Sequence, residues 1–136
     1  MSVIVTDHGF AEDDWTGPFA PPGAEAKLDA VDLASDTDIS GLVEQLPDLQ
    51  MIRIDFPSFA DGRGFTLARL LRLNGYRGRL RARGHVIADQ YAMARRAGFD
   101  EVEISAELAK RQPESQWLAR ANWRAHDYQS RLKQHA

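Results

Sequence analysis

The segment FPSFADGRGF, residues 56–65, places an aspartate and an arginine among glycines, directly after an apolar run and directly before a helical pattern. A second loop, GHVIADQ at residues 84–90, follows the next predicted strand. Ligands of parallel α/β sheets bind beyond the carboxyl ends of the strands, and helix N-termini favour anions. The side chains that we expect to converge at this edge of the sheet are Asp61, Arg63, His85, Asp89 and Gln90, with Arg83 beneath them.

These residue types support a binding and a structural interpretation. An arginine fork can bind carboxylate, phosphate or sulfo oxygens in a bidentate manner. Asp61 can instead cap the helix, and the DGRG glycines can supply turn geometry. The segment is neither a P-loop nor the dinucleotide-binding GxGxxG. If the site is catalytic, the candidate proton carriers are Asp61, His85 and Asp89. The candidates for binding an anionic ligand are Arg63, Arg79, Arg81, Arg83, Asp61 and Gln90.

Alternating strand and helix patterns must position these residues. Residues 51–56, 79–83 and 101–104 have strand patterns, and helical patterns at residues 63–73 and 86–97 separate them. This alternation predicts an α/β fold built from βαβ units, with a small, mostly parallel sheet. Each strand alternates apolar with charged residues, so we expect helices on one face and a charged strand face on the other. A partial barrel and a three-layer arrangement are the alternatives.

The charged residues are unevenly distributed along the chain. Residues 1–62 carry a net charge of −11, residues 63–96 carry +8, and residues 97–136 are neutral, within an overall net charge of −3. Cross-strand ion pairs beneath an acidic N-terminal arm would explain this polarity. An anion site, a docking surface or the interior wall of a barrel completed by another chain would explain it too. The acidic balance and the lack of aromatics among the arginines argue against nucleic acid.

The length of 136 residues predicts a single domain, residues 1–136. We expect an extended acidic arm over residues 1–26, an α/β core over 27–104 and a C-terminal helical segment over 105–136. The chain has no cysteine, no recognisable metal or redox-cofactor motif, and neither a basic leader nor a membrane-spanning apolar run. We therefore expect a cytoplasmic protein with no membrane association and with no metal or cofactor of its own.

The C-terminal segment contains three aromatic side chains that could either pack in the core or bind a partner. From about Pro113 the pattern predicts a helix with an apolar face that continues to Leu132. Aromatic side chains on such a helix most often pack in the core, but tryptophan is also enriched at the centres of interfaces. The candidates for partner binding are Trp117, Trp123 and Tyr128.

Taken together, residues 50–104 resemble the bacterial family known as domain of unknown function 934. The resemblance implies a role in sulfur metabolism, because members are typically encoded beside genes for sulfite reductase and sulfate assimilation. Members often carry an oxidoreductase label, which the gene neighbourhood alone explains, so the sequence leaves open whether the protein is an enzyme. The motifs that carry the resemblance are FPSFADGRGF at 56–65, ARLLR at 68–72, GYRGRLRA at 75–82, DQ at 89–90 and RRAGFD at 95–100.

The leading hypothesis is an accessory protein of assimilatory sulfite or sulfate reduction that binds sulfite reductase or a neighbouring enzyme. The surfaces that it would use are the arginine-rich, anion-friendly sheet face, the DGRG loop and the last helix. One alternative is a small enzyme or sensor that binds a sulfo- or phospho-anion at the DGRG loop. Another is a self-associating α/β domain, which would form a homodimer through its charged strand faces. All three hypotheses are consistent with the sequence.

Overall fold

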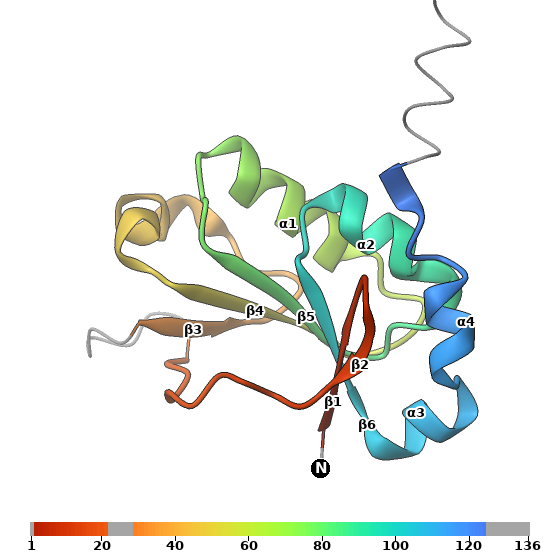
Figure 1. The fold of residues 1–136 in the computed structure, drawn as a ribbon. Helices are drawn as coiled ribbons and strands as arrows, with labels where there is room; N and C mark the ends of the chain where they lie inside the picture. Colours follow the sequence, from red (N-terminus) through yellow and green to blue (C-terminus); the bar gives the residue numbers. More distant parts are fainter. Residues whose placement is uncertain (1, 22–28, 125–136) are drawn as a thin grey trace, which may run out of the picture.

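One mixed sheet of six strands forms the centre of this computed structural model, which describes residues 2–21 and 29–124 (Figure 1). The four strands at one side of the sheet run parallel, and two further strands extend it in antiparallel fashion. The sheet is not closed. In spatial order the strands are β2 (Gly9–Ala11), β1 (Ser2–Thr6), β6 (Glu101–Ser105), β5 (Arg79–Gly84), β4 (Met51–Phe56) and β3 (Ala30–Leu33).

The helices α1 (Arg63–Leu73) and α2 (Tyr91–Ala97) connect the parallel strands and lie together on one side of the sheet (Figure 1). Residues 12–19, which follow β2, pass on the other side. The predicted α/β class and the predicted separation of a helical face from a charged face are therefore confirmed.

The core lies between the sheet and these two helices. The strands contribute alternate residues to it, such as Ile52, Ile54 and Leu80, which are fully buried. Leu71 of α1 and Ala94 of α2 cover them from the other side. Burial of one such aliphatic side chain contributes about 1.5–3 kcal/mol, so this layer holds the strand ends in place. The three phenylalanine rings of Phe56, Phe65 and Phe99 pack together in the same core.

Both edges of the sheet are covered. Ala20 exchanges backbone hydrogen bonds with β3, since its N–H donates to Ala30 and its carbonyl accepts from Asp32, each at 2.9 Å. At the other edge, the Glu114 carboxylate accepts from the Phe10 N–H at 2.8 Å. Covered edges do not offer unpaired backbone groups to another strand. Docking by strand addition is thus not favoured for this sheet.

Several element boundaries differ from the sequence-based expectation. The helix expected from Val86 begins later, as a 3-10 turn, η3 (Ala88–Gln90), that leads into α2. The Gln90 side chain accepts from the Ile87 N–H at the start of this turn. The region before β4 forms η1 (Ile39–Gly41) and η2 (Val43–Asp48), with Pro47 inside η2. Asp38 caps η1, because its side chain accepts from the Ser40 N–H.

The C-terminal part contains α3 (Ala106–Arg111) and α4 (Glu114–Leu118). The expectation of one helix from Pro113 onward is wrong, because α4 ends at Leu118 and a turn follows. Burial of Trp117 in the core fixes this short helix. Among the helices of residues 2–21 and 29–124, none combines the length and the apolar character needed to cross a membrane.

Candidate functional site

The loops that follow β3, β4 and β5 are joined by side-chain hydrogen bonds at one edge of the sheet. The Ser35 hydroxyl after β3 donates to Asp61 Oδ2 in the loop after β4 at 2.8 Å. In the loop after β5, Gln90 Nε2 donates to the Phe59 carbonyl at 3.2 Å. We call this set the strand-end cluster. Its members are Ser35, Phe59, Asp61, Arg63, His85 and Gln90.

Asp61 and Arg63 form a closed pair within the cluster. Arg63 Nε and Nη2 donate to the two Asp61 carboxylate oxygens at 3.0 and 2.9 Å, and the Arg63 N–H donates to Oδ1 at 3.1 Å. These bonds, together with that from Ser35, hold the pKa of Asp61 well below its usual range. The pair explains why the loop turns here: Asp61 satisfies a free N–H of the first turn of α1. The Nε and Nη2 groups of Arg63, which could bind an anion together, are thereby already bonded to Asp61.

His85 has a defined tautomer in its neutral form. Its ring Nδ1 lies 3.1 Å from the Phe56 carbonyl oxygen, which can accept but not donate. Nδ1 therefore carries the proton, and Nε2 is left as a hydrogen-bond acceptor. The Phe59 ring packs edge-on against His85, with centroids 4.9 Å apart. Phe59 nevertheless remains 44% exposed, which is unusual for a large aromatic side chain.

A hollow of about 210 Å³ opens beside Phe59 and His85. It lies at the carboxyl ends of β5 and β6, where ligand sites of parallel sheets form. Its walls mix apolar and polar groups, and the Glu107–Arg111 ion pair of α3, at 2.8 Å, forms part of them. The lining residues are Phe59, Gly84, His85, Ser105, Glu107, Leu108 and Arg111.

Asp89 and Gln90 have different roles from each other. The Asp89 carboxylate is largely exposed and pairs with Arg120 at 2.8 Å, which ties the C-terminal segment to the loop after β5. Gln90 uses its amide to join Ile87 and Phe59. Asp89 thus contacts the C-terminal segment, and Gln90 connects the loop after β5 to the loop after β4.

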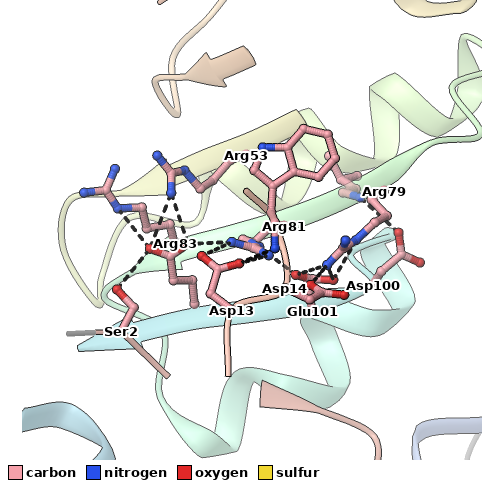
Figure 2. A network of polar contacts seen from close by, with 12 residues as sticks. Ser2, Asp13, Asp14, Arg53, Arg79, Arg81, Arg83, Asp100 and Glu101 are labelled. Atoms are coloured by element: carbon pink, nitrogen blue, oxygen red, sulfur yellow. Dashed lines mark hydrogen bonds and ion pairs between the residues drawn. The ribbon is translucent and has the colours of Figure 1, made fainter. Parts of the chain in front are cut away.

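The charged face of the sheet forms a continuous ion-pair network (Figure 2). Arg81 is 0% exposed, and its Nε and Nη1 donate to Glu101 and Glu103 at 2.6 and 2.9 Å. Burial alone would lower the pKa of Arg81, but its bonds to Asp13 and the charges and bonds of the two glutamates raise it. Arg53 pairs with Asp32 at 2.6 Å and with Glu103 at 3.1 Å. The central arginines are therefore matched by carboxylates of neighbouring strands.

The expected extended arm over residues 1–26 is extended only in part, because residues 2–6 and 9–11 form β1 and β2 of the sheet. Residues 12–19 cover the network, and from here on we call this shorter segment the acidic arm. Asp13 accepts from Arg81, and Asp14 accepts from Arg79 at 2.8 Å (Figure 2). Phe19 lies over the Arg53 guanidinium at 3.8 Å. Arg79 also binds Glu101 at 2.7 Å. The arrangement matches the hypothesis of cross-strand ion pairs beneath an acidic arm.

Arg83 differs from its neighbours on β5. Its side chain is 48% exposed and its Nε lies 3.7 Å from Glu103, at the margin of the network. It lies on the charged face, away from the Asp61–Arg63 pair that was expected above it, because side chains of a strand alternate between faces. The structure thus separates the predicted ligand residues into a strand-end set and a sheet-face set.

The predicted partner-binding aromatics lie in different environments. Trp117 is 1% exposed, packs against Tyr91 and donates its Nε1 to the Gln112 carbonyl at 2.8 Å, so it is a core residue here. Trp123 is half-buried, lies against Arg95 and donates to Asp7 at 3.3 Å. Tyr128 falls outside the described residues.

Arg72 is a structural residue that the sequence reasoning missed. Its guanidinium donates to the carbonyl oxygens of Tyr76, Gly78 and Gly98 at 2.8–3.0 Å, and to Asp100 at 3.0 Å. Segments far apart in sequence are thereby joined at the amino ends of β5 and β6. The motifs ARLLR, GYRGRLRA and RRAGFD all meet at this side chain, so much of their conspicuous pattern serves the fold. The spacing of these motifs along the sequence does not predict that they contact the same arginine.

A metal site is not evident in the part of the chain that the structure describes, where no three His, Cys, Asp or Glu side chains are grouped to hold an ion.

A family model described as a bacterial protein of unknown function, DUF934, matches residues 30–136. Comparison with curated proteins finds no match, and neither does comparison with solved structures. The matched range includes the strand-end cluster and β3 to β6, and it begins after the acidic arm.

Proposed function

This chain belongs to the DUF934 family of bacterial proteins of unknown function, and we propose that it is an accessory protein of assimilatory sulfite or sulfate reduction. In this proposal its strand-end cluster binds sulfite reductase or a neighbouring enzyme of the same route. The protein would work in the bacterial cytoplasm. The sulfur context comes from the resemblance described above.

The observation that carries the binding role is the exposure of Phe59. This ring is held by His85, and its backbone carbonyl is held by Gln90, so it does not need to be ordered when a partner arrives. A fixed aromatic side chain loses little conformational entropy on binding, and aromatic anchors contribute disproportionately to interface energies. The adjoining hollow offers space for a side chain of the partner.

The polar surroundings of Phe59 also suit an interface. Asp61 with Arg63, and Glu107 with Arg111, are already paired within the chain. A protein interface typically has a desolvated centre and a polar rim, and unpaired charges at the rim would raise the cost of desolvation. Paired charges around one exposed aromatic residue reproduce that pattern. They also leave less of Arg63 for a small anion.

Growth on defined sulfur sources tests this role. We expect cells that lack the gene to grow poorly with sulfate or sulfite as the sulfur source and normally with cysteine. A wild-type copy should restore growth, and a Phe59→Ala copy should not. Leu73→Ala is the matched control, because Leu73 is also an exposed apolar residue, 76% exposed on α1, outside the cluster. Equal growth of the deletion strain on all three sulfur sources would contradict the proposal.

A further inference from the structure

The outer edge of the Arg81 guanidinium is a preformed carboxylate site. The inner groups, Nε and Nη1, are held by Glu101 and Glu103 of the adjacent strand. The outward edge binds Asp13 of the acidic arm in a bidentate manner, through Nη2 at 3.0 Å and Nη1 at 3.1 Å. Because strand residues fix Arg81 independently of the arm, its outward fork would keep its orientation if Asp13 left.

Two further contacts continue this site along the sheet. Arg79 Nη2 donates to Asp14, the next residue of the arm, and also to Glu101 of the adjacent strand. The Phe19 ring lies against Arg53, 3.8 Å from the guanidinium carbon to the ring centroid. The face therefore binds two consecutive carboxylates and one aromatic ring. A surface with these contacts is complementary to an extended acidic peptide that has an aromatic residue a few positions after its two carboxylates.

The arm is held by side-chain contacts, without the backbone ladder that holds the strands. Residues 12–19 have no regular secondary structure, and the residues 12, 13 and 14 are exposed. Within the described chain, the Trp15 indole Nε1 is buried without a hydrogen-bond partner. Segments with few buried apolar contacts open at a lower free energy than the core, and a buried unsatisfied donor lowers that free energy further. The arm is thus the part of this face that can be exchanged.

We propose that the arginine face of the sheet is a second binding surface, which accepts an acidic segment with an aromatic residue from a partner protein in place of the chain's own arm. The bound arm is then an internal competitor that keeps Arg53, Arg79 and Arg81 covered until such a segment arrives. This surface is separate from the strand-end cluster, so the inference does not depend on the proposed docking at Phe59.

A peptide with the sequence of residues 12–19, EDDWTGPF, tests the inference in trans. The full chain with both Asp13→Asn and Asp14→Asn has a weakened internal competitor. Fluorescence anisotropy of the labelled peptide should show at least ten-fold tighter binding to this double variant than to the wild-type chain. Binding should weaken as salt is added, because the contacts are ionic. The control peptide, with Asn at both aspartate positions, should not bind either chain measurably.

Nuclear magnetic resonance identifies the surface that the peptide contacts. We expect its addition to shift signals of Arg53, Arg79 and Arg81 in the double variant, with little change at Phe59. Absence of binding to a folded double variant would overturn the inference, and so would shifts confined to the strand-end cluster. A double variant that fails to fold, as judged by circular dichroism, would show that the arm is an integral part of the core and would overturn it as well.

Discussion

The Phe59 ring lies edge-on against His85, with ring centroids 4.9 Å apart and an interplanar angle of 86°. Edge-to-face pairs of this kind contribute about 0.5–1.5 kcal/mol beyond burial. His85 is in turn held by the Phe56 carbonyl through both its backbone N–H and its ring Nδ1. An exposed aromatic residue is therefore fixed by the end of β4, and this is the feature on which the proposed docking role rests.

The two glycines of the DGRG loop should respond in opposite ways to substitution by alanine. A Cβ at Gly64 would overlap the Phe56 ring, whereas a Cβ at Gly62 meets nothing within 4 Å. We expect Gly64→Ala to cost about 1–3 kcal/mol of unfolding free energy, as overpacked cores do. Gly62→Ala should be neutral or stabilise by up to about 1 kcal/mol, because it restricts the unfolded chain. Urea unfolding of both variants measures the difference, and equal effects would contradict the packing at Gly64.

Two arginines on the same strand should differ in their contribution to stability. Removal of Arg81 leaves Glu101 and Glu103 buried with a main cationic partner lost, which we expect to cost about 3–5 kcal/mol. Removal of the half-exposed Arg83 should cost about 1 kcal/mol or less. Chemical denaturation of Arg81→Ala and Arg83→Ala is the measurement. Similar costs for the two variants would mean that the network beneath the acidic arm is not formed in solution.

Substitution of Arg72 should destabilise the protein far more than substitution of Arg69 on the same helix. Arg72→Ala leaves the Tyr76, Gly78 and Gly98 carbonyl groups without their donor. An unsatisfied polar group costs about 1–3 kcal/mol where it is buried, so we expect a loss of at least about 2 kcal/mol. Arg69 is exposed on α1, and Arg69→Ala should change the unfolding free energy by less than about 0.5 kcal/mol. Thermal and urea unfolding distinguish the two outcomes.

The contribution of the Asp61–Arg63 pair should depend on pH. The bonds from Arg63 and Ser35 lower the folded-state pKa of Asp61 below its usual 3.8, so its contribution is present above that pH and is lost as the pH falls below it. The gap in unfolding free energy between wild type and Asp61→Asn should therefore be largest near neutral pH and shrink below about pH 4.

Asp48→Asn provides the control for this pH series, because it removes an exposed carboxylate of η2 with the same change in net charge. Urea unfolding at several pH values between 7 and 3 gives the gap directly. A gap for Asp61→Asn that stays constant over this range would show that the carboxylate is not paired in the folded protein.

The repeating patterns of the sequence predicted the central fold well. The strands around Ile54, Ala82 and Val102 alternate apolar with charged residues, and this local period is enough to assign a buried and a charged face. The helix over Arg63–Leu73 has the expected bounds as well. These features depend on neighbouring residues, which is why they can be read from one segment at a time.

The parts that sequence reasoning missed depend on contacts between distant segments. The antiparallel hairpin of β1 and β2 joins the sheet through β6, about 100 residues later in the chain. The convergence of three segments on Arg72 has the same origin. The sequence could place Asp61, His85 and Gln90 at a common edge of the sheet, but it could not say which charges would already be paired within the chain.

Quantitative affinity capture from the native cytosol tests the central claim, that Phe59 anchors an enzyme of sulfite reduction. Tagged wild-type, Phe59→Ala and Leu73→Ala chains would each be used to capture proteins at low and moderate salt, and mass spectrometry would quantify what is bound. We predict that wild type and Leu73→Ala recover sulfite reductase or a neighbouring enzyme of the route, and that Phe59→Ala loses at least nine-tenths of it, since loss of a central aromatic anchor typically costs about 2 kcal/mol or more. Equal recovery by all three chains, or recovery of no such enzyme by wild type, would contradict the account.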